Sequence, residues 1–514
     1  MPKLKTIEKV LVANRGEIAI RVCRTLREMG IASVAVYSVP DRGAPHVYAA
    51  DEAHLIGPAA APQSYLNAAK ILEVARATGA DAIHPGYGFL AESAAFAQQV
   101  LDAGLIWIGP TPESSRALGD KVSARALAVA AGVPVLPGTP GPVADIGALK
   151  KAADKIGYPV VLKAAAGGGG KGMRRVNGPA EFESAVRLAQ GEARSAFGDD
   201  RLYLERWVEQ PRHIEVQLLA DERGNVIALG ERDCSVQRRH QKVIEETPSP
   251  ALDALKRREL WELAVRVARA GKYTNAGTAE FLMDRQGRFY FLEMNARLQV
   301  EHPVTEIVLG MDLVREQVRI AQGEPLEFTQ AEVKPVGAAF EFRIYAEDPD
   351  HGWLPQAGTI RRLVLPDGPY VRCDFGVRAG GEVPVHYDPM IGKIIVWGRT
   401  RGEALARSRR AIGETILEGT PTTLPFHRWI LEQKEFVSGA YDTAYLSKHF
   451  REALPPDAVR EEREAAALAA AFAVLERSAP LVAPPDGAAA AGESASRWRA
   501  AVPSLRTVPE RDWR

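Results

Sequence analysis

The stretch Glu293-Met-Asn-Ala-Arg-Leu-Gln-Val-Glu-His-Pro-Val-Thr-Glu306 follows a pattern typical of a β-hairpin. An apolar-rich run over 277–283 precedes the turn residues Asp-Arg-Gln-Gly at 284–287, and a second apolar run over 289–292 leads into Glu293. Apolar runs separated by a short polar, glycine-containing segment indicate two antiparallel strands. The sequence therefore predicts a hairpin whose second strand runs into a polar segment.

Two carboxylates are predicted to face each other across this hairpin. A turn centred near Gln286 sets Glu280 roughly opposite Glu293, where cross-strand neighbours lie about 5 Å apart and like charges repel. A proton, a cationic side chain or a metal must then lie between them. Asn295 shares the face of Glu293 because strand side chains alternate. Two carboxylates and an amide suit Mg²⁺; a partly buried strand edge with Lys or Arg partners is the alternative.

The next polar residues, Arg297, Gln299 and Glu301, continue the two-residue spacing. A guanidinium, an amide and a carboxylate are therefore predicted to converge on one side of an extended segment. Such a group forms a pocket for a small planar oxyanion with an acid–base residue beside it. A solvated polar face would give the same spacing.

Composition excludes several classes of protein. A chain of 514 residues is too long for one core, so three or four subdomains are expected. Lys plus Arg and Asp plus Glu both number 65, so no global field favours nucleic acid or an anionic membrane. Cys23, Cys234 and Cys373 are widely separated, which predicts a reducing, cytoplasmic compartment. We expect no signal peptide and no membrane span.

The N-terminal part predicts a doubly wound α/β domain. A strand over 10–13, a helix over 17–29 and a strand over 33–38 form a βαβ opening. The GxGxxG fingerprint of dinucleotide-binding domains is absent, since only Gly16 lies in the turn. The Gly-Pro loop over 82–89 follows a strand end, where loops line ligand crevices in open α/β sheets.

A small unit over about 134–208 contains four consecutive glycines, Gly167, Gly168, Gly169 and Gly170. They confer mobility and close backbone approach, so a phosphate-cradling loop is predicted and a flexible linker is the alternative. A Walker A loop is excluded because Gly172 follows Lys171. Lys163 closes an apolar strand and is predicted to face an anion, although a surface lysine would fit as well.

Further polar residues point towards a nucleotide. The segment Glu205 to Val208 is predicted to be an extended link that reads an adenine edge or serves as a hinge. His213, Glu215 and Gln217 alternate on a strand. The donor-rich run over 231–242 suits phosphate, whereas a solvated charged face is the ordinary alternative.

The C-terminal half is predicted to be β-rich from 334 to 449. Residues 339–348 alternate and place Arg343 on one face with Glu341 and Tyr345. An amphipathic helix is predicted over 405–417. After Arg451 the composition predicts a helix over 457–477 and an Ala-, Pro- and Gly-rich linker over 478–496.

Together these motifs resemble the biotin carboxylase family, the ATP-grasp component of biotin-dependent carboxylases. The resemblance covers about residues 5–450 and is carried by VANRGEIAIR (12–21), HPGYGFLAE (84–92), GDKVSA (119–124), GGGGKGM (167–173), ERDCSVQRRHQK (231–242), EMNARLQVEHPVTE (293–306) and DPMIGK (388–393). It implies a doubly wound domain over 1–120, an ATP-grasp domain over 121–335 with a mobile lid at about 134–208, a β-rich C-terminal domain over 336–450 and a tail over 451–514. It also implies that ATP activates bicarbonate to carboxyphosphate, which delivers carbon dioxide to the ureido nitrogen of biotin.

The resemblance assigns site residues by position. The ATP positions are Lys121, Lys163, Gly167, Gly168, Gly169, Gly170, Met173, Glu205, Arg206, Val208, His213, Gln237, His240, Glu280, Leu282 and Glu293. The Mg²⁺ or Mn²⁺ positions are Glu280, Glu293 and Asn295. The bicarbonate positions are Lys242, Arg297, Gln299, Val300 and Glu301, with Glu301 as general base. Arg343 matches the arginine that stabilises the biotin enolate, with Tyr87 near that pocket, and the catalytic residues are Arg297, Glu301, Lys242 and Arg343.

The sequence departs from larger carboxylases in one respect. None of its seven Met residues precedes a Lys, so the Ala-Met-Lys-Met biotin-attachment signal is absent. Biotin is therefore expected on a separate carboxyl carrier protein, with a separate carboxyltransferase, and family analogy favours a homodimer. The final acceptor, whether acetyl-CoA, propionyl-CoA, another acyl-CoA or pyruvate, is left open. The alternatives are another ATP-grasp carbon–nitrogen ligase, which should lack the Arg297 series together with Arg343, and a nucleotide-binding scaffold, which the intact acidic residues disfavour.

Overall fold

The computed structural model describes residues 4–165 and 173–450. The four glycines predicted to cradle phosphate, Gly167–Gly170, lie outside the described residues, as do the helix and linker predicted after Arg451. Within the two described ranges, no helix combines the length and the apolar character that crossing a bilayer requires.

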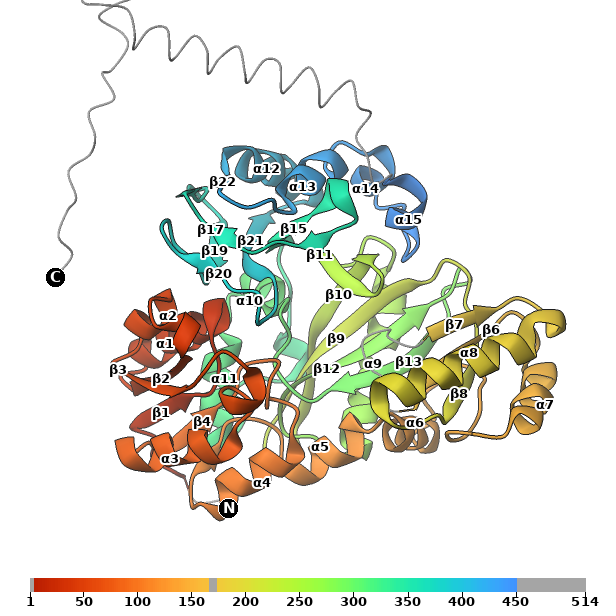
Figure 1. The fold of residues 1–514 in the computed structure, drawn as a ribbon, viewed down its shortest axis with the longest axis horizontal. Helices are drawn as coiled ribbons and strands as arrows, with labels where there is room; N and C mark the ends of the chain where they lie inside the picture. The colour runs from red at the N-terminus through yellow and green to blue at the C-terminus, as the bar shows by residue number, and fades with distance from the viewer. Residues whose placement is uncertain (1–3, 166–172, 451–514) are drawn as a thin grey trace, which may run out of the picture. The chain divides into compact units, whose positions relative to one another are not determined.

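A five-stranded parallel sheet forms the N-terminal part (Figure 1), with strand order β3-β2-β1-β4-β5. Its strands are β1 (Lys9–Val12), β2 (Ala32–Ser38), β3 (Glu52–Gly57), β4 (Ala82–His84) and β5 (Ile106–Trp107), and its longer helices are α1 (Gly16–Glu28), α3 (Ala68–Thr78) and α4 (Ala94–Asp102). Gly16 has a φ of 68°, the left-handed conformation that the sharp β1–α1 turn requires of a glycine. The predicted doubly wound fold is confirmed, with the first strand, helix and second strand each shifted by one residue at one or both ends.

His84 closes β4 and is fully buried against α11 (Leu313–Ala321). Its Nδ1 accepts a hydrogen bond from the Gly86 N–H at 3.0 Å, and its Nε2 donates to Gln317 Oε1 at 3.2 Å. Because one ring nitrogen accepts and the other donates, the imidazole of His84 is neutral. Burial lowers the pKa of His84 to about 4, although the bond to Gln317 opposes the shift.

His84 should make the protein less stable in mild acid. Above pH 6.5 the ring is neutral in both states; as the pH falls towards about 4, the unfolded chain takes up a proton that the folded chain refuses. The free energy of unfolding then falls by up to about 1.4 kcal/mol per pH unit. In His84→Asn, whose Oδ1 still accepts the Gly86 N–H, the midpoint of thermal unfolding should depend less on pH over this window. The exposed His386→Asn serves as control, and identical pH slopes in wild type and His84→Asn would refute the argument.

An eight-stranded antiparallel sheet forms the centre, with strand order β13-β12-β9-β10-β11-β14-β21-β19. The strands are β9 (Arg212–Ala220), β10 (Val226–Arg238), β11 (Gln241–Thr247), β12 (Asn275–Met283), β13 (Phe289–Asn295), β14 (Ala338–Tyr345), β19 (Val371–Phe375) and β21 (Met390–Gly398). Because β11 pairs with β14, the sheet runs continuously across the domain boundary predicted at 335/336.

A separate three-stranded sheet, β7-β6-β8, lies within the small unit over about 134–208 and has its own small core. It contains β6 (Val160–Ala164), β7 (Met173–Val176) and β8 (Leu202–Arg206), with α7 (Ile146–Ile156) and α8 (Pro179–Phe197). Figure 1 shows α8 lying along the three strands. Glu205 lies on β8, so the link predicted to begin at Glu205 is wrong there: residues 202–206 pair with β6 and continue the strand.

The remaining helices flank these sheets. They are α2 (Pro45–Ala49), α5 (Pro112–Gly119), α6 (Lys121–Ala130), α9 (Ala254–Ala270), α10 (His302–Leu309), α12 (Arg401–Glu414), α13 (Leu424–Ile430), α14 (Lys434–Ser438) and α15 (Tyr445–His449). Short strand pairs join β15 (Glu347–Asp348) to β16 (Leu354–Pro355), β17 (Gly358–Thr359) to β20 (Glu382–Val383) and β18 (Arg362–Val364) to β22 (Ile416–Glu418). The helix predicted over 405–417 begins earlier, because Thr400 caps it through the Glu403 N–H, and ends before β22.

Candidate active site

The β12–β13 hairpin has the predicted register. Glu280 pairs with Glu293 and Thr278 with Asn295, and a bulge follows Glu280. Glu280, Glu293 and Asn295 all line one cleft of about 550 Å³. The antiparallel pairing and the shared face are therefore confirmed.

The donor set of this hairpin fits a divalent cation. Glu280 lies 2.8 Å from Lys242 Nζ and 3.1 Å from His213 Nε2, and Glu293 lies 3.4 Å from Lys121 Nζ. Burial opposes ionisation of Glu280, but Lys242 and His213 outweigh it and hold its pKa far below the usual range. The amide oxygen of Asn295, the atom that could bind a cation, accepts a hydrogen bond from Arg297 Nη2 at 3.2 Å. Two carboxylates and an amide oxygen that line one cleft are the ligand types that Mg²⁺ takes, with room left for phosphate.

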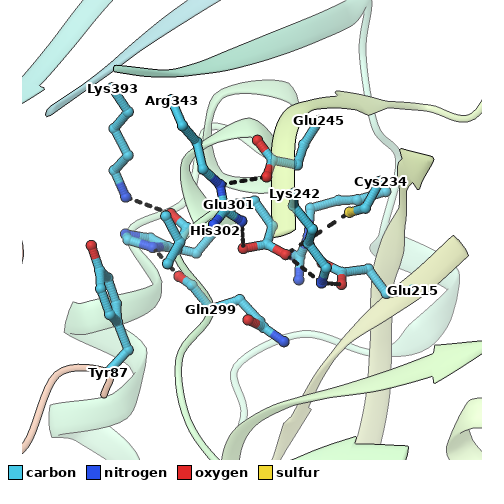
Figure 2. A network of polar contacts seen from close by, with 12 residues as sticks. Tyr87, Glu215, Cys234, Lys242, Glu245, Gln299, Glu301, His302, Arg343 and Lys393 are labelled. Atoms are coloured by element: carbon cyan, nitrogen blue, oxygen red, sulfur yellow. Dashed lines mark hydrogen bonds and ion pairs between the residues drawn. The ribbon is translucent and has the colours of Figure 1, made fainter. Parts of the chain in front are cut away.

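Lys242 on β11 is the centre of the polar network (Figure 2). Its Nζ lies 2.5 Å from Glu215 Oε2, 2.8 Å from Glu280 Oε1 and 2.8 Å from Glu301 Oε1. Burial disfavours the ammonium, but the three carboxylates outweigh burial and raise the pKa of Lys242 well above its ordinary value. Lys242 is therefore a fixed positive charge on the cleft wall.

Glu301 is fully buried at the N-cap of α10 and is held by two cations. Its Oε1 accepts from Lys242, and its Oε2 accepts from Arg343 at 2.9 Å. Burial opposes the charge, yet Lys242, Arg343 and Arg232 hold the pKa of Glu301 well below the usual range. Arg343 is shared with Glu245, whose Oε1 lies 2.6 Å from its Nε. Figure 2 shows Arg343 between the two carboxylates.

The segment after β13 departs from the predicted regular alternation. Arg297 donates to Gln299 Oε1 at 2.9 Å and Gln299 donates to Glu280 Oε1 at 3.3 Å, and both line the cleft. The strand ends at Asn295, however, and the chain turns into α10. Glu301 therefore lies buried beside Lys242 rather than on the open cleft wall with Arg297 and Gln299.

Most of the residues predicted to bind nucleotide or bicarbonate come together. The cleft is lined by Lys121, Lys163, Met173, Glu205, Arg206, Val208, His213, Gln237, His240, Lys242, Glu280, Leu282, Glu293, Asn295, Arg297, Gln299, Val300 and Arg343. Lys163 Nζ lies 2.5 Å from Glu205 Oε2, so the lysine faces a carboxylate in this structure. Tyr87 is not among the cleft-lining residues; within the described part of the chain its hydroxyl contacts Glu17 on α1.

Sequence reasoning did not single out Arg232 within the donor-rich run over 231–242. Its guanidinium is fully buried and donates to Glu215 at 2.6 Å, Gln217 at 2.8 Å, Thr305 at 3.0 Å and Thr278 at 3.1 Å. Glu215 thus bridges Arg232 and Lys242. The alternation of Glu215 and Gln217 on β9 was the available signal, because two polar side chains on a buried strand face require a polar partner.

Three family models match consecutive parts of the chain. The biotin carboxylase N-terminal domain matches residues 6–114, the carbamoyl-phosphate synthase L chain ATP-binding domain matches 120–329, and the biotin carboxylase C-terminal domain matches 341–448. The ATP-binding model, named for carbamoyl-phosphate synthase, is thus flanked on both sides by models named for biotin carboxylase.

Relatives and solved structures agree with these models. The chain is 52% identical to a biotin carboxylase of Nostoc over 86% of its own length and 99% of the relative's, and 49% identical to the rat mitochondrial methylcrotonoyl-CoA carboxylase subunit alpha over 88% of its own length and 63% of that subunit's. A structure of a Campylobacter jejuni biotin carboxylase–β,γ-ATP complex superposes with a TM-score of 0.84 at 45% identity, covering 86% of this chain and 99% of that chain. The chain belongs to the biotin carboxylase family.

Proposed function

We propose that this protein carboxylates biotin, held on a separate carrier protein, with ATP and bicarbonate through carboxyphosphate. The observation that carries the proposal is the juxtaposition in one cleft of the Glu280–Glu293 hairpin with Lys242 and Arg297. A divalent-cation and phosphate site then adjoins a cationic pocket for a small planar anion. Phosphoryl transfer to bicarbonate requires these two sites side by side.

At the phosphate end, the chain supplies charge and position. Lys121 and Lys163 face the cleft and bind the phosphates, while Glu280, Glu293 and Asn295 hold the cation. When bound, Mg²⁺ or Mn²⁺ neutralises phosphate charge and orients the γ-phosphate. The glycine loop and the β6–β8 unit are proposed to close over the nucleotide.

At the bicarbonate end, Arg297 and Lys242 bind the anion, with Gln299 and the Val300 backbone beside it. When bicarbonate binds next to Lys242, its negative charge offsets part of the stabilisation that the ammonium gives to the Glu301 carboxylate. Glu301 then becomes basic enough to take the bicarbonate proton, because its acidity depends on Lys242 and Arg343. The deprotonated oxygen attacks the γ-phosphorus, the bond to ADP breaks, and the products are carboxyphosphate and ADP.

At the biotin end, Arg343 stabilises the negative charge that develops on the ureido oxygen. Carboxyphosphate breaks into carbon dioxide and phosphate; the phosphate takes the N1 proton of biotin, and the nitrogen forms a bond to carbon dioxide. A planar guanidinium suits the delocalised ureido enolate better than an ammonium does. Its other contacts, Glu245 and Glu301, fix its plane.

We further propose the domain division given by the sequence motifs, action with a biotin carrier and a carboxyltransferase, a homodimeric state and a cytoplasmic location. The solved biotin carboxylase domain of Hydrogenobacter thermophilus 2-oxoglutarate carboxylase, 45% identical with a TM-score of 0.84 over 87% of this chain and 98% of that chain, is a dimer bound to MgADP, ADP and bicarbonate, which supports the dimer. The match to 99% of the length of the Nostoc biotin carboxylase supports a separate carrier. Three free cysteines support a reducing compartment.

Free biotin tests the proposal. With ATP, Mg²⁺ and labelled bicarbonate, we expect biotin to stimulate ADP release and to appear as acid-labile labelled carboxybiotin in equal amount. Ammonia and amino acids, offered in place of biotin, should give no stimulation, which separates this activity from that of other ATP-grasp ligases. Label in carbamoyl phosphate or an acyl product, with none in biotin, would refute the proposal.

A further inference from the structure

Lys393 on β21 is a buried cation to which the site described above gives no role. It closes the DPMIGK motif, and no part of its side chain is exposed. A buried ammonium is unfavourable unless charges and hydrogen bonds compensate it. Its position therefore requires partners that hold it there.

The partners of Lys393 come from two different substrate regions. Its Nζ donates to the backbone carbonyl of Val300, in the bicarbonate segment, and lies 3.3 Å from Glu17 Oε1. The same Nζ lies 5.6 Å from the ring centroid of Tyr87, which is assigned to the biotin side. Figure 2 shows Lys393 and Tyr87 on the same side of the network, with Lys393 directed towards the segment that carries Gln299 and His302.

Glu17 connects Lys393 to Tyr87. It lies on α1, is 5% exposed, and its Oε1 also accepts the hydroxyl of Tyr87. Burial raises the pKa of Glu17 to about 7, and Lys393 opposes that rise. Contacts therefore run without a gap from Tyr87 through Glu17 and Lys393 to Val300.

The position of Lys393 also ties it to Arg343. The two residues are direct neighbours in the β14–β21 register, so one pair of strands fixes both cations. Their ion pairs differ: Arg343 contacts Glu245 and Glu301, whereas Lys393 contacts Glu17. Both cations also act on the buried carboxyl of Glu341, whose pKa burial raises and the two cations lower. Arg343 thus serves the reacting atoms, while Lys393 is left to hold the segments around them.

We propose that Lys393 is a positioning residue that fixes the Val300 backbone and, through Glu17, the Tyr87 loop in one alignment, so that bicarbonate activation stays coupled to carboxyl transfer to biotin. The inference rests on the proposed function. Val300 lies between Gln299 and Glu301, so a shift of its carbonyl moves both residues. Without the alignment, carboxyphosphate meets water before biotin: water adds to the carbonyl carbon, the C–O bond to phosphate breaks, and bicarbonate and dihydrogen phosphate are released. ATP is then consumed without carboxybiotin.

Lys393→Met tests the inference, since Met keeps the length and removes the charge. We expect the ATP cleaved per carboxybiotin formed to rise about tenfold, together with the KM values for biotin and bicarbonate, because small misplacements of reacting groups have effects of this size. The KM for ATP should stay within about twofold of wild type, since Lys393 does not line the nucleotide cleft. Glu17→Gln should uncouple in the same direction, and the double variant should be no worse than the more severe single variant, as expected of two members of one contact chain.

Lys256→Met is the matched control. Lys256 also has a carboxylate partner, Glu259 at 2.8 Å, and lies 5.6 Å from the ring centroid of Phe289, but it is on α9 away from the cleft. Lys256→Met should leave the ATP cleaved per carboxybiotin formed unchanged. If Lys393→Met does not fold, Glu17→Gln decides. The inference is overturned if the wild type is active and the folded variants cleave as much ATP per carboxybiotin as it does. It is also overturned if the KM values for ATP, biotin and bicarbonate all rise equally. A wild type that forms no carboxybiotin overturns the proposed function instead.

Discussion

Glu301→Gln is expected to lower kcat for biotin carboxylation by about 10²–10⁴-fold, the range that a positioned general base contributes. The substitution keeps the size of the side chain and removes the charge that lies between Lys242 and Arg343. Nucleotide binding should survive, because Glu301 does not line the cleft that holds the predicted ATP residues. The measurements are labelled carboxybiotin formation under saturating substrates and the binding of ATP by fluorescence.

Glu231→Gln provides the comparison. Glu231 is as deeply buried as Glu301, but it contacts Arg257 and Trp261 beneath α9. Turnover by the folded Glu231→Gln protein should equal that of wild type. Wild-type turnover in Glu301→Gln would show that another group accepts the bicarbonate proton, and joint loss of ATP binding would show that Glu301 organises the cleft rather than reacting.

Arg232→Met is expected to destabilise the fold by about 3–5 kcal/mol, the usual effect of leaving one partner of a buried ion pair uncompensated. The substitution removes the hydrogen bonds to Glu215 and Gln217 on β9, to Thr278 on β12 and to Thr305 on α10. Of the two cations that pair with Glu215 in the described part of the chain, Lys242 would then remain. The loss should appear as an earlier first transition in urea, followed by tryptophan fluorescence.

Arg288→Met is the surface counterpart. Arg288 also pairs with a carboxylate, Asp284 at 2.7 Å, but its side chain is 64% exposed. Exposed pairs contribute little to stability, so its transition should stay close to that of wild type. A transition of Arg232→Met that coincides with that of Arg288→Met would mean that water or a rearranged Lys242 satisfies Glu215.

The sequence predicted those features whose cause is local. The hairpin register follows from two apolar runs and one turn, and counting from Gln286 sufficed to pair Glu280 with Glu293. The first strand, helix and second strand lie within one residue of their predicted bounds, because local apolar runs and the turn at Gly16 mark them. Family motifs supplied candidate site residues that spacing alone left ambiguous, and these assignments stay predictions.

Features that depend on distant partners escaped prediction. Nothing local indicates that β11 pairs with β14, because the two strands are far apart in the chain. Arg232 was signalled only indirectly, by the polar residues Glu215 and Gln217 on β9, and Lys393 gave no local signal. A lysine or arginine in a strand is usually on the surface, and the burial of these two depends on acids from other elements. The alternation predicted for Arg297, Gln299 and Glu301 does not reach Glu301. Strand β13 ends at Asn295, and the chain then turns to begin α10.

The β11–β14 pairing limits how this protein can be divided. A fragment that stops near residue 335 lacks β14, so the backbone groups of β11 that bond to it lose their partners and that edge is open to association with other chains. The same cut separates Arg343 from Lys242, which lie on those two strands. Expression boundaries, affinity tags and fusion joints therefore belong outside 4–450 or in exposed turns, and isolated halves are poor substitutes for the intact unit.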